Sequence, residues 1–176
     1  CKGGGHGDYH LIVLAPASVQ EMADFVDLGF ELAFRYRTPA MILADGAIGQ
    51  MMEKVVLPPF KPRRTEEEIR KECPWATTGR FGGRKPNIIT SLELRSEEME
   101  IINLRIQEKY KKIEESEVRF EEYMLDDAEY AIVAFGSAAR IAKKSIEIAR
   151  SQGIKVGLLR PITLWPFPPK EVPKLG

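Results

Sequence analysis

The sequence predicts an α/β fold with mainly parallel strands. Three short apolar runs, residues 11–15, 40–44 and 130–135, have the composition of buried strands, and each stands next to a segment with helical periodicity. Apolar runs without alternation are typical of parallel sheets whose two faces are both covered. Strand–helix–strand units therefore span residues 11–44 and 130–159, and we expect each crossover to be right-handed.

The first unit begins with a loop and a strand over residues 10–15. We expect a helix from Ser18 to Arg37, because Ser18 stands three residues before Glu21, which is the spacing of a capping box. One face of this helix is apolar at steps of three and four residues. Its members are Met22, Phe25, Val26, Gly29, Leu32, Ala33 and Tyr36. Gly29 on that face indicates close packing against the sheet.

The second strand, residues 40–44, ends at Asp45-Gly46 and is followed by a short helix over residues 47–53. Residues 54–90 differ in composition from the rest of the chain, because they contain five prolines, a charge cluster and a glycine-rich patch. Such composition is typical of a connection between domains rather than of a core.

A long and highly charged helix is expected over residues 97–123, with Ser96 as its cap. Its single apolar stripe recurs every seven residues, with two flanking members. The stripe consists of Met99, Ile106, Ile113 and Phe120, flanked by Ile102 and Tyr110. A helix with one narrow apolar stripe lies on a surface or bridges domains.

The second unit then follows. A third buried strand over residues 130–135 turns at Gly136-Ser137 into a helix over residues 138–151. Gly153 is placed to end this helix, and residues 154–159 form the next strand. A second α/β domain is therefore expected from about residue 126 onward.

Composition excludes several classes of protein. The 26 basic and 26 acidic residues cancel, which gives no electrostatic case for binding nucleic acid or an anionic membrane. Cys1 and Cys73 lack the spacing of a zinc site or a disulfide framework, so we expect no metal site and a cytoplasmic location. No apolar run reaches the roughly 18 residues that a membrane span needs. A Lys- and Glu-rich charge set with few Asn favours a heat-adapted source.

The two ends of the sequence also carry an expectation. The chain starts at Cys1 without Met and stops at Gly176 in a proline-rich stretch. A sheet of few strands is marginal by itself. We therefore expect an internal piece of a longer polypeptide.

The loop from Gly3 to Asp8 is the strongest candidate for a ligand site. Its consecutive glycines let the backbone approach a ligand closely. His6 is suited to proton transfer near neutral pH, and Asp8 is placed to orient it. The alternative is a loop whose His and Asp only satisfy backbone groups. The glycines precede the strand, so the loop is not a dinucleotide fingerprint, in which glycines follow a strand.

Two further positions are candidates on weaker grounds. Asp45-Gly46 follows a parallel strand, where α/β sheets place ligands. Gly136-Ser137 at a helix start, with Arg140 one turn on, is a pattern that binds anions. In both cases a structural interpretation is favoured: a turn closed by the Asp45 side chain, and a simple N-cap with a solvated Arg140.

Several motifs follow one another in a characteristic order. In the first half they are His6-Gly7-Asp8, Ser18-Val19-Gln20-Glu21, and Tyr36-Arg37-Thr38-Pro39 leading to Asp45-Gly46. In the second half they are the GSAARIA segment at 136–142 and the GLLRPITLWPF segment at 157–167. Over almost its whole length the chain resembles the α subunit of 2-oxoacid:ferredoxin oxidoreductases, of the 2-oxoisovalerate or 2-oxoglutarate type.

This resemblance implies a fold and a set of domains. Residues 1–57 would be the C-terminal part of a thiamine-diphosphate pyrimidine-type domain with a parallel sheet. Residues 58–95 would be an inter-domain linker and residues 96–125 a bridging helix. Residues 126–176 would start a transketolase C-terminal-like α/β domain.

The resemblance also implies a function. The family's complex decarboxylates a 2-oxo acid oxidatively on thiamine diphosphate, passes the electrons through iron–sulfur clusters to ferredoxin, and forms an acyl-CoA from coenzyme A. The thiamine diphosphate and its Mg²⁺ would be held mainly by the β subunit, and the clusters by partner subunits of the β, γ and δ kinds. The chain would act as a subunit of this enzyme and not alone.

The resemblance assigns the glycine-rich loop to cofactor binding through Gly5, His6, Gly7 and Asp8. No catalytic residue is carried over, because the family's thiamine-activating Glu would lie upstream of Cys1. The alternative function is a non-enzymatic α/β module, for nucleotide binding or scaffolding in a larger assembly, since one fold hosts many functions. The identity of the 2-oxo acid stays open at this point.

Overall fold

The computed structural model describes Gly3, Gly7 and residues 9–77, 79, 80, 83 and 85–168. The chain forms two compact units. One comprises residues 1–57 and 106–176, and the other comprises residues 58–105. The first unit holds both sheets and is described first.

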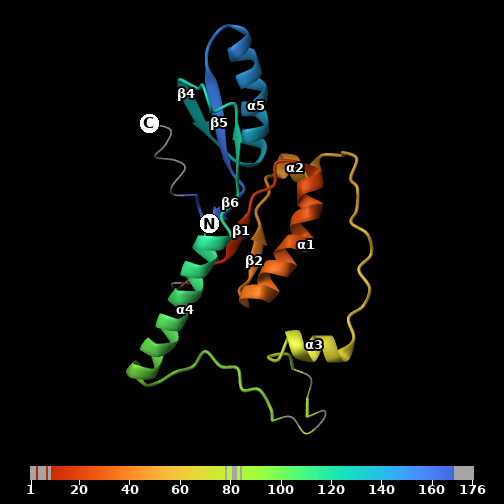
Figure 1. Ribbon diagram of the computed structural model, residues 1–176, viewed down its shortest axis with the longest axis vertical. Coiled ribbons are helices and arrows are strands. Elements are labelled where there is room, and N and C mark those ends of the chain that lie inside the picture. The colour runs from red at the N-terminus through yellow and green to blue at the C-terminus, as the bar shows by residue number, and fades with distance from the viewer. Residues whose placement is uncertain are drawn as a thin grey trace. The chain divides into compact units, whose positions relative to one another are not determined.

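The first sheet has the strand order β2-β1-β6 (Figure 1). β1 is Ile12–Leu14, β2 is Ala40–Ile42 and β6 is Thr163–Trp165. β1 and β2 run parallel, with Ile12 opposite Ala40, whereas β6 pairs antiparallel with β1. The predicted parallel pair is therefore confirmed, and a strand from the far end of the chain completes its other side.

The helix α1, Val19–Tyr36, connects β1 to β2 and packs against both strands. The hydroxyl of Ser18 accepts the backbone N–H of Glu21 at 3.2 Å, which confirms the predicted N-cap. A Cβ atom on Gly29 would lie 3.7 Å from the Cβ of Ala40. The predicted close packing of the helix against the sheet is therefore confirmed at this position.

The second sheet has the order β3-β5-β4. β3 is Phe120–Tyr123, β4 is Tyr130–Val133 and β5 is Val156–Pro161. β4 and β5 are parallel and are connected by α5, Gly136–Ser151, which packs against β5 (Figure 1). β3 pairs antiparallel with β5. The second predicted strand–helix–strand unit is therefore confirmed, and each sheet is mixed rather than purely parallel.

Two apolar clusters form the core of this unit. The larger surrounds β1, where Ile12 and Val13 are fully buried together with Leu32 of α1 and Ile113 of α4, Ser96–Ser116. The smaller lies between α5 and β5. It consists of Ala139, Ala142, Ile146 and Leu158. α2, Gly46–Gln50, adds a short helix after β2.

The predicted helix over residues 97–123 is too long. α4, Ser96–Ser116, ends early, and Phe120 belongs to the strand β3 instead of the helical stripe. The cause is pairing with a distant segment. The backbone N–H of Arg119 donates to the hydroxyl of Thr163 at 2.9 Å, and Phe120 lies opposite Pro161. Residues 96–125 are therefore a helix followed by a strand.

Two strands predicted as buried are edge strands. β4 leaves Tyr130 and Val133 exposed, and β2 is only half-buried. The two central strands, β1 and β5, each have a neighbour on both sides and are buried over all or most of their length. A continuous apolar run therefore predicts a strand, but it does not predict whether that strand is central or at the edge of the sheet.

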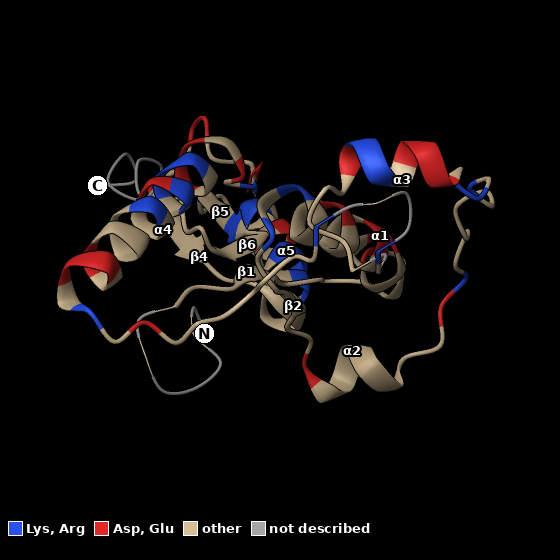
Figure 2. Cartoon of the chain, turned by 90° about the horizontal axis from the view of Figure 1, so that it is seen from below, with Lys and Arg blue, Asp and Glu red and all other residues tan. Residues whose placement is uncertain are grey.

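The second unit contains α3, Glu66–Glu72. Thr65 and Glu68 form a reciprocal capping box, with the side chain of each accepting the backbone N–H of the other. Side chains of both charge signs follow one another along this helix (Figure 2). The domain boundaries expected at residues 57, 95 and 125 stay predictions.

Candidate functional site

The glycine-rich loop lies largely outside the described residues. Gly5, His6 and Asp8 belong to that part of the chain, so their assignment to cofactor binding stays a prediction. Gly7 is described and has φ +111°, a conformation that L side chains rarely adopt. A glycine is therefore required at this point of the loop.

The residue that anchors the end of this loop is His10, which the sequence analysis did not single out. Its ring stacks on Tyr110 of α4 with centroids 4.7 Å apart, and lies 4.9 Å from the ring centre of Trp165. The backbone N–H of His10 donates to the Tyr110 hydroxyl at 3.0 Å. Its Nδ1 is buried without a hydrogen-bond partner in the described part of the chain. Two elements distant in sequence, α4 and β6, thus fix the entrance to β1.

The structure brings the two weaker candidates together at one place. Oδ1 of Asp45 accepts the N–H of Ile48 at 2.9 Å and so caps α2. Oδ2 of the same carboxylate accepts the N–H of Ser137 at 3.0 Å, at the start of α5. One side chain therefore caps two helices, which start at Gly46 and at Gly136.

These bonds lower the pKa of Asp45 to about 2. The largest cause is a hydrogen bond from the Ser137 side chain, followed by the backbone N–H groups of Ile48, Ser137 and Ala47. Both carboxylate oxygens are therefore engaged, one by the N–H of Ile48 and the other by the N–H of Ser137. The interpretation of Asp45 as a structural residue is supported, although it caps helices rather than closing an isolated turn.

The predicted anion site at the start of α5 is not available to a ligand. Phe135 is the N-cap and forms no side-chain capping bond, so Asp45 supplies the negative charge there instead. Gly136 has φ +61°, and a Cβ on it would approach Oδ2 of Asp45 to 3.3 Å. Arg140 is exposed to solvent, as expected, and its guanidinium also pairs with Glu53 at 2.6 Å.

A cavity of about 440 Å³ opens beside Asp45 at the carboxyl ends of β2 and β4. Its lining comes from two segments, residues 43–45 and residues 133–138, and is mainly apolar. Ligands of α/β sheets commonly bind at this edge. The negative charge of Asp45 and the helix start that it caps favour an apolar, uncharged group in this cavity over an anion.

A second, charged cavity of about 250 Å³ lies at the start of α1. The carboxylate of Glu21 accepts the N–H of Ala17 at 2.7 Å and binds both terminal nitrogens of Arg160. The side chain of Arg160 is almost completely buried and also donates to Glu121 at 3.0 Å. Burial opposes the charged form of Arg160, but these two carboxylates raise its pKa. The cavity is therefore lined by charges that are already paired.

Among the described residues, no group of three or more His, Cys, Asp or Glu side chains is placed to hold a metal ion. In that same part of the chain, no helix has both the length and the apolar character needed to cross a membrane.

Two family models match this chain. Residues 4–125 match the pyruvate flavodoxin/ferredoxin oxidoreductase, thiamine diphosphate-binding domain. Residues 128–176 match the core domain II of pyruvate:ferredoxin oxidoreductase. These models describe an α/β thiamine-dependent class of oxidoreductase domain, which agrees with the observed sheets. The chain belongs to the pyruvate flavodoxin/ferredoxin oxidoreductase family, and the predicted relationship to 2-oxoacid:ferredoxin oxidoreductases is confirmed.

Curated relatives give the same result. The chain is 51% identical over 175 residues to the ketoisovalerate oxidoreductase subunit VorB of Methanothermobacter marburgensis, covering 99% of this chain and 48% of the relative. It is 34% identical over 194 residues to the 2-oxoglutarate synthase subunit KorA of Methanocaldococcus jannaschii, covering 99% of this chain and 52% of the relative. The chain thus spans about half the length of the curated relatives it matches.

A solved structure supports the fold. A 2-oxoglutarate:ferredoxin oxidoreductase from Magnetococcus marinus, solved with 2-oxoglutarate, coenzyme A and succinyl-CoA, matches with a TM-score of 0.73 at 22% identity. The match covers 98% of this chain and 34% of that one. The predicted fold class is therefore confirmed.

Proposed function

We propose that this chain is part of a subunit of a complex that oxidatively decarboxylates a 2-oxo acid to an acyl-CoA, with ferredoxin as electron acceptor. The observation that carries the proposal is the 51% identity to a ketoisovalerate oxidoreductase subunit along 99% of the chain. In this reaction the bond to the carboxyl carbon breaks and CO₂ leaves. The electrons pass to ferredoxin, and the acyl group is transferred to the thiol of coenzyme A.

The substrate class in this proposal is the branched-chain 2-oxo acids. Support comes from the difference in identity between relatives. Two ketoisovalerate oxidoreductase subunits are 51% and 48% identical to this chain, whereas the 2-oxoglutarate synthase subunits are 29–34% identical. A 2-oxoglutarate specificity is the second candidate, since those subunits match along 96–99% of the chain.

The described residues do not themselves fit a Mg²⁺–diphosphate group. They provide no cluster of metal ligands, and both oxygens of the Asp45 carboxylate accept helix N–H groups. The binding of thiamine diphosphate, and that of the iron–sulfur clusters, is assigned mainly to β, γ and δ partner subunits, in a cytoplasmic complex that ferredoxin and coenzyme A reach from solution.

The part of the chain assigned to the cofactor is the loop containing Gly5, His6, Gly7 and Asp8. Support comes from the described residues beside it: position 7 requires a glycine, and His10, three residues further on, is fixed by Tyr110. Replacing His6 and Asp8 together by Ala in the intact complex tests this role. The expected result is a lower rate of CoA-dependent ferredoxin reduction, and an unchanged kcat and KM would contradict it.

The function itself is tested on the purified complex that contains this chain. Ferredoxin reduction is followed with 2-oxoisovalerate, 2-oxoglutarate and pyruvate, each with and without coenzyme A. We expect CoA-dependent reduction with a kcat/KM that is highest for 2-oxoisovalerate. A colourless preparation with no reduction from any 2-oxo acid, even with added thiamine diphosphate and Mg²⁺, would favour the non-enzymatic scaffold instead.

A further inference from the structure

The hydrogen-bond ladder between β1 and β2 stops one step before His10. Its first bond runs from the backbone N–H of Ile12 to the carbonyl of Pro39 at 3.2 Å. Only every second residue of a parallel strand donates to a given neighbour, so the preceding donor in this ladder is His10. By the same register its acceptor would be the carbonyl of Arg37. The N–H of His10 donates instead to the hydroxyl of Tyr110, at 3.0 Å.

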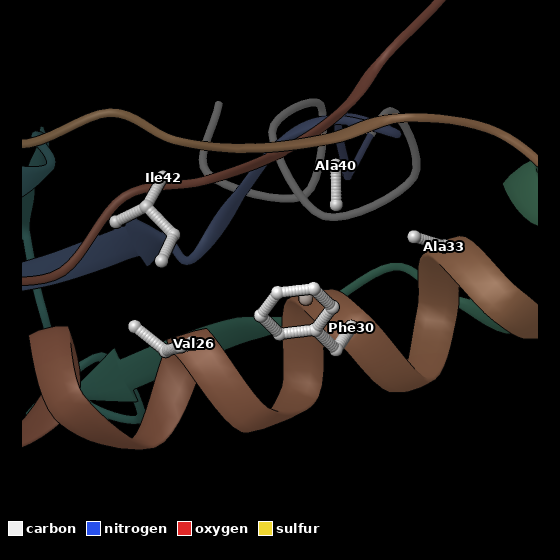
Figure 3. A pocket seen from close by; sticks show the side chains of 6 residues that line it. Val26, Phe30, Ala33, Ala40 and Ile42 are labelled. Atoms are coloured by element: carbon white, nitrogen blue, oxygen red, sulfur yellow. The ribbon is translucent and has the colours of Figure 1, made fainter.

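The turn between α1 and β2 explains why Arg37 stands outside the ladder. Arg37 is the C-cap of α1 and has φ 48°, in the left-handed region. Its N–H and that of Thr38 both donate to the carbonyl of Ala33. Figure 3 shows Ala33 of α1 and Ala40 of β2 on the two sides of a cavity of about 220 Å³ that is lined by apolar residues. Arg37 is therefore fixed to the end of the helix, and β2 begins only at Ala40.

Two consecutive residues of α4 take the place of the bond that the ladder does not make. The hydroxyl of Tyr110 is the acceptor for the N–H of His10. Nζ of Lys109 is a donor to the carbonyl of Arg37, at 3.4 Å. Backbone groups require such partners when they are withdrawn from water. These two side chains of α4 therefore allow the chain to leave the ladder at His10 with both backbone groups paired.

The aromatic rings around His10 make Tyr110 a fixed acceptor. Tyr110 and Trp165 are each only 6% exposed, and their rings meet edge to face with centroids 5.5 Å apart. The ring of His10 packs on both of them. Its Nδ1 is buried without a hydrogen-bond partner in the described part of the chain. The described contacts therefore hold His10 through its backbone N–H and its ring packing, and not through Nδ1.

We propose that Tyr110 is a positioning residue for the loop from Gly3 to Asp8, because its hydroxyl holds the chain away from β2 at His10 and so sets the point at which this loop joins the core. Gly7 has φ +111°, so a defined backbone conformation is required three residues before that point. Tyr110 acts through the loop and is not a catalytic residue. The proposal rests on the proposed function only in giving this loop a role in turnover.

The first test compares two Tyr→Phe changes in the intact complex. Tyr110→Phe removes the hydroxyl and keeps the ring. The matched control is Tyr36→Phe, which also removes a tertiary hydrogen bond, made to the buried Glu117 at 2.6 Å. We expect Tyr110→Phe to lower kcat for CoA-dependent ferredoxin reduction roughly five- to tenfold, because displaced groups react slowly, and Tyr36→Phe to leave it within about twofold. Equal losses of kcat in the two variants, or an unchanged kcat in Tyr110→Phe, would overturn the proposal.

A double-mutant cycle determines whether Tyr110 acts through the loop. In a complex that already carries His6→Ala and Asp8→Ala, Tyr110→Phe should lower kcat by less than about twofold further, since residues that act as one unit are not additive. The full loss in this background would assign Tyr110 to the core alone. His10→Phe keeps the backbone N–H and a stacking ring, so it should retain kcat and its pH profile. A loss in His10→Phe as large as that in Tyr110→Phe would place the effect on the imidazole and contradict the proposal.

Amide hydrogen exchange makes the test independent of turnover. Tyr110→Phe should accelerate exchange roughly tenfold at Tyr9, His10 and Leu11 and leave α1 unchanged. If Tyr110→Phe does not fold, Lys109→Met should accelerate the same amides roughly threefold, because it unpairs the carbonyl of Arg37. Unchanged exchange at these amides, or faster exchange throughout the chain, would overturn the proposal. A wild-type complex that reduces no ferredoxin would instead contradict the proposed function, and the exchange result would still decide the role of Tyr110.

Discussion

Replacing Arg160 by Met removes the cation that connects α1 to the second sheet. Its side chain is 4% exposed, and one terminal nitrogen donates to Glu21 and to Glu121 at 3.0 Å each. The other terminal nitrogen pairs with Glu21 as well. Met has a similar length and fills the volume, so the change isolates the loss of charge and hydrogen bonds from the loss of packing.

The magnitude follows from what the two carboxylates lose. Removing one partner of a fully buried ion pair costs roughly 3–5 kcal/mol, because it leaves a buried charge uncompensated. Here Glu21 is 27% and Glu121 is 33% exposed, so water screens part of that charge. Glu121 also keeps Lys143, and Glu21 keeps the N–H of Ala17. We therefore expect Arg160→Met to cost about 2–3 kcal/mol.

Amide hydrogen exchange in the intact protein measures this cost locally. A loss of about 2–3 kcal/mol corresponds to roughly 30- to 160-fold faster exchange in β5 and in the first turn of α1. The matched control is Lys144→Met, because the Lys144–Glu147 pair is 74% and 47% exposed and should contribute little. Adding Glu21→Gln to Arg160→Met should recover part of the loss. Exchange that accelerates less than threefold would refute the assignment of a buried ionic connection.

Three other perturbations have defined outcomes. The pKa of Asp45 is lowered to about 2, so its stabilising effect is full above about pH 4 and is lost as the pH falls toward 2. In a plot of the unfolding midpoint against pH, Asp45→Asn should therefore reduce the fall at acidic pH. Gly136→Ala should lower the thermal midpoint, because a Cβ at φ +61° costs roughly 1–2 kcal/mol, whereas Gly46→Ala, which meets open space, should not. Glu117→Gln should cost roughly 1–3 kcal/mol and speed exchange at the end of α4, because its buried carboxylate accepts bonds from three side chains; unchanged exchange would contradict this.

The local part of the fold was predictable from the sequence. Ser18 at the start of α1 and Gly29 against Ala40 depend on residues close in sequence or on the size of one side chain, and both were predicted correctly. The end of α4 was not predictable in this way. Residues 117–123 continue the charged, seven-residue pattern, and they form a strand only because β5 and Thr163 offer backbone and hydroxyl partners.

The same limit applies to the candidate sites. Sequence spacing identified Asp45 and Ser137 separately. No local signal indicates that the Asp45 carboxylate caps α5 by accepting the N–H of Ser137. His10 was missed because a single His beside an apolar run usually belongs to the core, and its partner Tyr110 is 100 residues away. Contacts between residues far apart in sequence define these sites, and a single sequence read by itself does not indicate such contacts.

Charged hydrogen bonds hold α1 at both of its ends. At its N-terminal end, Arg160 of β5 binds the carboxylate of Glu21. At its C-terminal end, the hydroxyl of Tyr36 and the guanidinium of Arg35 donate to Glu117, at 2.6 and 3.1 Å. Burial by itself would raise the pKa of Glu117, but hydrogen bonds from these donors and from Arg119 outweigh it. The pKa of Glu117 is therefore lowered, and the carboxylate stays charged near neutral pH.

Both ends of α1 are therefore held by residues that follow it in sequence by more than 80 positions. α1 cannot shift without breaking these charged hydrogen bonds. Arg160→Met removes only the attachment at the N-terminal end, so amide exchange should accelerate more in the first turn of α1 than in its last turn, which Glu117 still holds. Equal acceleration in both turns would show that the two attachments do not act separately.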